Sequence, residues 1–365
     1  MTPVRVGVVG CGLMGRVHSR NVDGAGGEIV AGADVDAETR AEFEEEFGVP
    51  THEDHGALLA SEVVDAVVVT TPNRFHEPAA VDALEAGCSV FVEKPLAHSL
   101  ESAERIAAAA RDAPGFCMVG FHSRFSPAAT ATKAYADRGR FGEIDHVEAT
   151  YVRQRGIPSP GSWFTNGELS GGGALIDVGV HVLDLAMFML DHPEPVEATG
   201  VSRSTFGPRE DYADPDGFAT SWSGGGGTFD VEDSVSAFIR FETGQTVSLE
   251  VAWATNRPAA NEVTLRGTEA GAQFEIEGEV VDVYEAADVG VDHYLTTEID
   301  ARGGPDGHVV EMERFLDALQ RDELPAENTV DEGLTVQRVI DAIYRSSEDG
   351  RAYSVVDGAV PGGLD

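Results

Sequence analysis

Three glycines near the start of the chain have the spacing of a phosphate-binding loop. The motif Gly10-Cys11-Gly12-Leu13-Met14-Gly15 follows the apolar run Val4–Val9 and opens the helix-like segment Leu13–Asn21. A G-x-G-x-x-G pattern alone is a weak signal, but a strand before it and a helix after it supply the context that dinucleotide binding requires. The sequence therefore predicts a dinucleotide-binding loop here.

Each part of this loop has an expected role. Gly10 would make a tight turn, Gly12 would let the backbone approach a pyrophosphate, and Gly15 would let the helix pack on the strand. Leu13 and Met14 lie in the first helical turn, whose N–H groups and dipole attract phosphate. All five residues are predicted to bind the cofactor.

A carboxylate follows the second strand-like run at the spacing used for ribose recognition. Asp34 ends the run Glu28–Ala33 and follows Gly15 by 19 residues. A carboxylate in this place accepts hydrogen bonds from ribose hydroxyls and repels a 2′-phosphate, so Asp34 favours NAD over NADP. Arg40 is the nearby cation that argues for NADP instead. The alternative role for Asp34 is a helix N-cap.

Lysine is nearly absent from the chain. The chain has two lysines, Lys94 and Lys133, and 23 arginines, since Lys and Arg total 25. Lys94 lies in Glu93-Lys94-Pro95, directly after the strand-like run Ser89–Val92, where ligands bind in open parallel sheets. An ammonium can lower its pKa on burial and exchange a proton, whereas a guanidinium cannot. We predict a catalytic role for Lys94 and a surface position for Lys133.

A second loop is expected at the same edge of the sheet. It follows the strand-like run Ala66–Thr70 and carries Thr71, Pro72, Asn73 and His76. Pro72 stiffens this turn as Pro95 stiffens the other. These four residues and Glu93 are predicted to line the cofactor site.

The segment Ser170–Asp184 reads as a glycine-rich entry into a helix. Asp177 and His181 are four residues apart and share a face, as do His181 and Asp184 at a spacing of three. Such an aspartate can orient the imidazole or raise its pKa, and the imidazole can then pass a proton to or from a hydroxyl. The alternative is a helix-capping aspartate with a core histidine, and the spacing alone favours it.

The order of the elements indicates an α/β protein with two domains. Strands alternate with helices in the first third, which predicts a parallel, doubly wound sheet. Their ranges are 4–9, 28–33, 66–70, 89–92 and 116–120 for strands, and 13–21, 42–47, 78–86 and 100–111 for helices. Later strands separated by short turns predict a large, mostly antiparallel sheet. Their ranges are 144–153, 196–203, 234–241, 246–252, 262–266, 272–276 and 280–284.

The expected domains are 1–123 and 124–365. The second domain also holds helices at 128–138, 309–320 and 330–346, and the last of these is allowed to pack back near the first domain. The segment Ser204–Asp233, which includes Gly224–Gly227, is rich in Gly, Asp and Pro and is expected to be a long mobile surface loop.

Composition excludes several classes of partner. The formal net charge is -39, which disfavours nucleic acid and anionic membranes. An acidic surface with so few lysines resembles proteins of salt-in halophiles, whose self-repulsion is screened by salt. Cys11, Cys88 and Cys117 are odd in number and widely spaced, without a disulfide or zinc pattern. No signal peptide or membrane span is recognised, so we expect a cytoplasmic protein without a metal.

Taken together, these motifs resemble the family of glucose-fructose oxidoreductase, inositol dehydrogenase and rhizopine-catabolism proteins (Gfo/Idh/MocA). The resemblance covers nearly the whole chain, and Glu93-Lys94-Pro95 with Asp177 and His181 is its most specific part. It implies a Rossmann domain followed by an α+β domain on an open sheet, through which such chains form homodimers or homotetramers.

The resemblance also implies a reaction, the NAD(P)-dependent oxidation of a hydroxyl on a sugar, cyclitol or related polyol. His181 would be the base, Lys94 would polarise the oxygen, and Asp177 would position the substrate or the imidazole. Other expected substrate-binding residues are His122, Arg124, Tyr151, Arg153 and Trp163.

Two further questions stay open at this stage, the role of the arginines and the function. The arginines would suit a carboxylated or phosphorylated sugar, or would be structural. The alternative functions are an NAD(P)-binding sensor without turnover and a redox-assisted glycoside-cleaving enzyme that recycles its NAD.

Overall fold

The computed structural model describes residues 3–159, 161–218 and 228–355, so Gly224–Gly227 lie outside the described residues. The chain divides into two compact units. Unit 1 comprises the chain up to His122 together with residues 308–337, and unit 2 comprises residues 123–307 together with the chain from Arg338. Each unit is described by itself.

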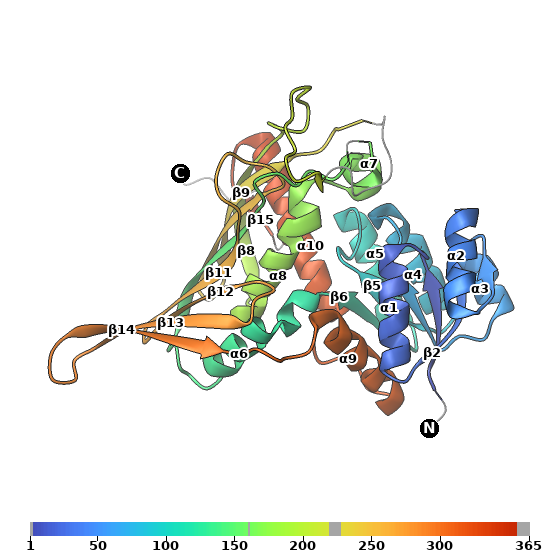
Figure 1. Ribbon diagram of the computed structural model, residues 1–365, viewed down its shortest axis with the longest axis horizontal. Coiled ribbons are helices and arrows are strands. Elements are labelled where there is room, and N and C mark those ends of the chain that lie inside the picture. The colour runs from blue at the N-terminus through green and yellow to red at the C-terminus, as the bar shows by residue number, and fades with distance from the viewer. Residues whose placement is uncertain (1–2, 160, 219–227, 356–365) are drawn as a thin grey trace. The chain divides into compact units, whose positions relative to one another are not determined.

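Unit 1 contains a six-stranded parallel sheet in the order β3-β2-β1-β4-β5-β6 (Figure 1). The strands are β1 (Arg5–Val9), β2 (Glu28–Ala33), β3 (Thr51–His52), β4 (Ala66–Val69), β5 (Ser89–Glu93) and β6 (Cys117–Gly120). Every residue of β4, β5 and β6 is buried, as expected for strands covered on both faces. The strand order reverses between β1 and β4, which is where open sheets of this kind bind ligands.

Helices connect these strands. They are α1 (Leu13–Gly24), α2 (Ala37–Phe47), α3 (His55–Ser61), α4 (His76–Glu85) and α5 (Leu100–Asp112), with a short 3-10 helix, η1, at Asn73–Phe75. The predicted parallel α/β architecture is confirmed. The short elements β3 and α3 were not predicted, because two and seven residues are too few to show a periodicity.

Helix α9 (Gly307–Arg321) lies largely in unit 1, which differs from the expected division of the chain. Its apolar residues Met312, Phe315 and Leu316 join the core of the parallel sheet. The Phe315 ring contacts Phe91 and Phe116 edge-on, with centroids 5.6 and 5.7 Å away. The next helix, α10 (Val330–Asp349), begins in unit 1 and ends in unit 2.

Unit 2 contains a nine-stranded sheet in the order β14-β13-β12-β11-β7-β10-β9-β8-β15. The pair β7 and β10 is parallel and the other pairs are antiparallel, which confirms the mostly antiparallel prediction. The strands are β7 (Ile144–Val152), β8 (Pro195–Arg203), β9 (Ser234–Phe241), β10 (Thr246–Ala252), β11 (Ala260–Gly267), β12 (Gly271–Glu275), β13 (Val280–Ala287), β14 (His293–Asp300) and β15 (Tyr353–Ser354). Strand β14 was not predicted, since six of its eight residues are exposed and it lacks a buried apolar stripe.

The nine-stranded sheet is apolar on one face. Buried residues alternate along its central strands, as in Val247, Leu249 and Val251 of β10. Helices α6 (Pro127–Ala136) and α8 (Val180–Met189) contact strands of this sheet. They supply the apolar cover that the alternating pattern requires.

The segment Gly167–Met189 is long and apolar enough to cross a membrane, with a mean hydropathy of 1.5, contrary to our expectation that no stretch would be. However, 83% of its most apolar window is buried inside the protein. The core helix of a globular protein passes the same test of length and composition, so this segment is weak evidence for a membrane span.

Candidate active site

The glycine loop of unit 1 has the backbone that the motif predicts. Gly10 has φ +97, and a Cβ atom there would lie 2.8 Å from the Thr70 carbonyl oxygen. A Cβ on Gly15 would lie 2.0 Å from the Gly10 oxygen. Gly12 precedes α1, and none of the described atoms lies within 4 Å of where its Cβ would be. Gly10 and Gly15 are therefore required for close packing, whereas the space beside Gly12 stays open.

Asp34 is fixed next to this loop. Its carboxylate accepts hydrogen bonds from the Cys11 N–H and the Asp36 N–H, both at 2.9 Å. The residue that caps α2 is Asp36, whose side chain accepts from the Thr39 N–H. Asp34 is thus not the helix N-cap. The Arg40 guanidinium, the cation that would favour NADP, donates one hydrogen bond to the Asp34 main-chain carbonyl at 2.7 Å. One of its donors is therefore already used within the protein.

His76 joins two loops at the carboxyl edge of the sheet. Its Nε2 lies 2.8 Å from the Thr71 carbonyl oxygen and its Nδ1 lies 2.9 Å from the Pro95 carbonyl oxygen. Burial lowers the pKa of His76, and the two carbonyl oxygens act in the opposite direction. Both ring nitrogens face the main chain, so His76 positions the loops and offers no nitrogen to a cofactor.

Glu93 likewise has both carboxylate oxygens engaged. Its Oε1 lies 2.6 Å from Nε2 of His18 in α1, and its Oε2 accepts the Lys94 N–H at 3.0 Å. Lys94 is half-buried directly after β5, and its peptide bond to Pro95 is cis. The Glu93 carboxylate thus holds the turn that carries Lys94, and cofactor binding by Glu93 stays a prediction.

The loop residues fit a dinucleotide. Gly12 leaves an open cradle at the N-terminus of α1, where Leu13 and Met14 form the first turn. In the loop after β4, Pro72 precedes η1, Asn73 is buried, and the buried Thr71 Oγ1 has no hydrogen-bond partner among the described residues. An unsatisfied buried hydroxyl calls for a ligand or water partner.

In unit 2, three glycines explain how the chain reaches Asp177. Gly171 has φ +83 and ends the short helix α7 (Gly167–Ser170). A Cβ on Gly172 would lie 2.1 Å from the Tyr344 hydroxyl, and one on Gly173 would lie 1.8 Å from the Glu232 carbonyl oxygen. Gly172 and Gly173 are required because the chain passes directly against the Tyr344 hydroxyl and the Glu232 main-chain carbonyl.

Glu232 holds this glycine segment. Its carboxylate accepts the Gly173 N–H at 2.8 Å, the Leu175 N–H at 2.9 Å and the Tyr344 hydroxyl at 3.0 Å. Burial raises the pKa of Glu232, and its donors act against that rise. The expectation of a surface loop over Ser204–Asp233 is wrong at its end, because Glu232 and Asp233 are buried.

Asp177 lies in a π-helical turn, η4 (Leu175–Gly179), directly before α8. Its Oδ2 accepts a hydrogen bond from Nε1 of the fully buried Trp253 at 2.9 Å. His181 is in the first turn of α8 and is buried. A π-turn in a helix is frequent at functional sites, and here it carries the predicted Asp177.

The residues that support the Asp177 segment were not predicted from the sequence. Glu232, Trp253 and Tyr344 contact the Asp177 segment, although they follow Asp177 by 55, 76 and 167 residues. The local signal that could have drawn attention to Glu232 is its place between Gly224–Gly227 and the strand-like run 234–241.

Arg124, which was predicted to bind substrate, forms a buried ion pair in the structure. Its Nε and Nη2 donate to the two carboxylate oxygens of Asp184 at 2.8 and 2.5 Å. Both side chains are at most 1% exposed. This bidentate pair anchors α8 from within the core of unit 2, because a buried guanidinium needs a carboxylate partner.

The remaining predicted substrate residues are more accessible. Arg153 lies over the rings of Tyr151 and Phe218, at 5.4 and 4.9 Å. Trp163 stacks on Phe164 with centroids 3.8 Å apart. His122, in unit 1, stacks on His308 at 3.8 Å. They offer rings and one guanidinium to a ligand.

Arg155, two residues after Arg153, is engaged in hydrogen bonds within the protein. Arg155 donates to the carbonyl oxygens of Gln154, Ala213 and Thr255 and to Oδ1 of Asn256, at 2.6 to 3.1 Å. Its donors therefore serve the protein's own loops.

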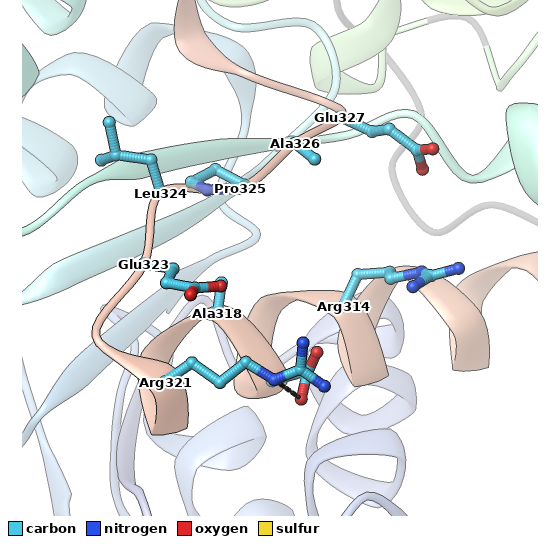
Figure 2. A pocket seen from close by; sticks show the side chains of 9 residues that line it. Arg314, Ala318, Arg321, Glu323, Leu324, Pro325, Ala326 and Glu327 are labelled. Carbon is cyan, nitrogen blue, oxygen red and sulfur yellow. Dashed lines mark ion pairs between the residues drawn. The ribbon is translucent and has the colours of Figure 1, made fainter.

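A shallow pocket of about 190 Å³ lies at the end of α9 (Figure 2). Arg321 there pairs with Asp317 at 2.9 Å, and Leu324 and Pro325 form the opposite wall. None of the predicted site residues lines this pocket, so it is separate from the candidate active site.

A group of four side chains in unit 1 has metal-binding chemistry. Ligand-type atoms of His18, Glu93, His308 and Glu311 lie within 4.8 Å of one another. Ligands 2.0 to 2.2 Å from one ion stand roughly 3 Å or more apart, whereas His18 Nε2 and Glu93 Oε1 are 2.6 Å apart. This separation is a hydrogen bond, and the group forms a hydrogen-bonded network.

Comparison with known proteins agrees with the fold and the loop. Residues 4–121 match the model of the oxidoreductase family with an NAD-binding Rossmann fold. Residues 130–273 match the GFO/IDH/MocA C-terminal domain.

Individual relatives cover between 58% and 98% of the chain. The D-glucoside 3-dehydrogenase of Escherichia coli K12 is 30% identical over 96% of this chain and 97% of its own length. The scyllo-inositol 2-dehydrogenase (NAD(+)) of Bacillus subtilis is 30% identical over 58% of this chain and 61% of its own. A levoglucosan dehydrogenase solved with NADH and levoglucosan superposes with a TM-score of 0.84 and 26% identity, covering 98% of this chain and all of that one. The chain therefore belongs to the GFO/IDH/MocA family of oxidoreductases.

Proposed function

We propose that this protein is an NAD-dependent dehydrogenase that oxidises a hydroxyl group of an uncharged sugar or cyclitol. The observation that carries the cofactor assignment is the Asp34 carboxylate, held beside the open Gly12 by two backbone N–H groups. In this position it accepts ribose hydroxyls and repels a 2′-phosphate. NAD would supply the hydride acceptor, held by the glycine loop, Asp34 and the Thr71 loop.

The proposal that the substrate is uncharged rests on the arginines. The Arg124 charge is matched by Asp184 in the core, and Arg155 donates to three carbonyls and an amide. These two engaged guanidiniums have little capacity left for a substrate carboxylate or phosphate. Arg153, which donates to the Gly156 carbonyl at 3.4 Å, is the candidate arginine left to a ligand, and we assign it to sugar hydroxyls. The named substrates of the glucoside, inositol and levoglucosan relatives are uncharged polyols, in agreement with this assignment.

We assign the chemistry to three residues. Lys94 polarises the substrate oxygen, His181 takes the hydroxyl proton, and Asp177, held by Trp253, positions the substrate or the imidazole. These roles follow from the family resemblance. The local structure supports them, because each residue lies in a segment that buried groups hold in place.

We further propose that the chain forms a homodimer or homotetramer through the open face of the nine-stranded sheet. Val201, Phe238, Tyr284 and Tyr294 are exposed and lie on the same face by the strand register. A face of this kind is typical of a contact between copies. Light scattering of Phe238→Asp should show a smaller species than the unmodified protein, and an unchanged mass would contradict this interface.

The expected compartment is the cytoplasm, and the expected partners are small molecules. Cys11, Cys88 and Cys117 are all free and buried, which fits a reducing compartment.

The test of the function is NAD reduction by the purified protein with uncharged sugars, anhydrosugars and inositols, beside aldonates and sugar phosphates. Lys94→Ala should lower kcat by orders of magnitude. The matched control is Lys133→Ala, because the Lys133 ammonium pairs with the exposed carboxylates of Asp137 and Asp191 in unit 2. Binding of NAD without turnover on any compound would favour a sensor, and a retained, non-exchanging NAD would favour the glycoside-cleaving alternative.

A further inference from the structure

Four titratable side chains meet inside unit 1, outside the set assigned to the reaction. His18 comes from α1, Glu93 ends β5, and His308 and Glu311 lie in the first turns of α9. His18, Glu93 and Glu311 are buried. The network links α1 and α9, which lie side by side in Figure 1, to the strand that precedes Lys94.

Glu93 bridges this network and the proposed catalytic lysine. One carboxylate oxygen lies 2.6 Å from His18 Nε2, and the other accepts the Lys94 backbone N–H at 3.0 Å. The carboxylate therefore has one orientation in which both contacts are made. Removing the His18 contact would leave one oxygen of a buried carboxylate without its donor, and the carboxylate would have to turn or draw in water.

We propose that His18 is a positioning residue for Lys94, acting through the Glu93 carboxylate. This rests on the proposed function, since it assumes that Lys94 acts on the substrate. His18 fixes the carboxylate, the carboxylate fixes the Lys94 main chain, and the main chain determines where the ammonium can reach.

The charges around His18 are consistent with this role. Glu93 on β5 and Glu311 on α9 face it, together with His308 on α9 and Lys94 after β5. Burial by itself raises the pKa of Glu93, but the hydrogen bond and charge of His18 have the opposite effect. The net result is a pKa lowered to about 2. Glu93 is therefore an anion in the working range of pH. The His18 ring also packs on Phe91 at 5.0 Å and on His308 at 5.8 Å, and His308 stacks on His122.

Two substitutions separate positioning from packing. His18→Gln can place an amide N–H where Nε2 stands and can keep the bond to Glu93, without a titratable ring. His18→Leu fills apolar space against Phe91 but has no donor. If His18 served packing alone, leucine would replace it at least as well as glutamine.

The scarcity of lysine provides a direct readout. Reductive methylation with 13C-formaldehyde labels Lys94 and Lys133, the two lysines of the chain, together with the terminal amine. NMR then follows the chemical shift of each methylated ammonium without cofactor or substrate. We expect the Lys94 signal to move in His18→Leu and to return towards its original position in His18→Gln. The Lys133 signal is the internal control and should stay unchanged.

Kinetics complete the test. We expect kcat to fall by about 10- to 100-fold in His18→Leu, with most of the loss recovered in His18→Gln and a changed pH profile. His55→Leu is the matched control, because His55 pairs with Asp82 at 2.9 Å in an exposed part of the same unit, and its kcat should be unchanged. His18→Asn, whose amide is too short to reach Glu93, repeats the test if the leucine variant does not fold.

Three results would overturn the proposal. The first is an unmoved Lys94 signal in His18→Leu, and the second is a glutamine variant no better than the leucine variant. The third is stoichiometric zinc in the purified protein that disappears in His18→Gln, because a metal site would then replace the hydrogen bond. Lys94→Ala, measured in parallel, separates these from failure of the proposed function: if it retains turnover, the function is wrong whatever the His18 variants show.

Discussion

The Arg124–Asp184 pair gives a prediction whose magnitude follows from the structure. Both side chains are at most 1% exposed, and two hydrogen bonds join them. Removing one partner of such a buried pair leaves an uncompensated charge and costs about 3 to 5 kcal/mol. Arg124→Met and Asp184→Leu should each lower the free energy of unfolding by that amount. In a unit of about 200 residues this corresponds to a fall in Tm of roughly 6 to 20 °C.

The double variant distinguishes a structural arginine from a substrate ligand. Arg124→Met with Asp184→Leu replaces the pair by apolar side chains and should recover most of the lost stability. If Arg124 is structural, this double variant should also keep its KM for uncharged substrates. Scanning calorimetry and steady-state kinetics measure the two effects.

An exposed ion pair is the control. Arg140 pairs with Glu285 on the same unit, with the arginine side chain 39% exposed. Arg140→Met should change stability by at most about 1 kcal/mol. The reasoning fails if the Arg124 and Asp184 single variants behave like this control, or if the stable double variant loses substrate affinity.

Four further predictions follow. Trp253→Phe removes the donor to Asp177 and should lower kcat about tenfold, since a hydrogen bond to a charged group contributes about 1.5 kcal/mol or more; unchanged turnover would contradict the role of Trp253 in positioning Asp177. Asp34→Asn keeps an acceptor but loses the charge, so the ratio of kcat/KM with NAD to that with NADP should fall by at least about tenfold. Burial raises the pKa of Glu232 above its ordinary value of 4.5, so between these two values the folded protein binds a proton that the unfolded chain has lost. The contribution of Glu232 to the free energy of unfolding should therefore decrease as pH rises through this window, and denaturant titrations should show that Glu232→Gln loses this contribution. Finally, the net charge of -39 predicts a Tm that rises steeply between about 0.1 M and about 3 M KCl, and a Tm indifferent to KCl would contradict the halophilic interpretation.

The features predicted best from sequence are those encoded locally. The glycine loop, the strand before it and Asp34 lie within 30 residues of one another, and the structure places them side by side. The parallel sheet was predictable because each buried strand is a continuous apolar run. The sequence allowed Asp34 as the N-cap of α2, whereas the structure shows that Asp36 is the N-cap. Both aspartates precede α2, and their spacing cannot distinguish them.

The features that sequence reasoning missed depend on distant partners. Spacing on α8 made Asp184 a candidate partner for His181, whereas the structure pairs it with Arg124, 60 residues earlier. Glu232 and Tyr344 become neighbours of the glycine segment only when the unit folds. His18 stands three residues after the glycine motif, but its link to Glu93 spans 75 residues. A one-dimensional pattern identifies the residue types in a site and leaves out the groups that hold them.

The most direct measurement of the central claim is NAD reduction by the unmodified protein and by Lys94→Ala, in molar KCl, with uncharged and charged sugars side by side. The account predicts turnover on an uncharged sugar or cyclitol with NAD preferred to NADP, loss of turnover by orders of magnitude in Lys94→Ala, and NAD binding retained in that variant. Turnover that survives in Lys94→Ala, or that occurs only with carboxylated or phosphorylated sugars, would contradict it.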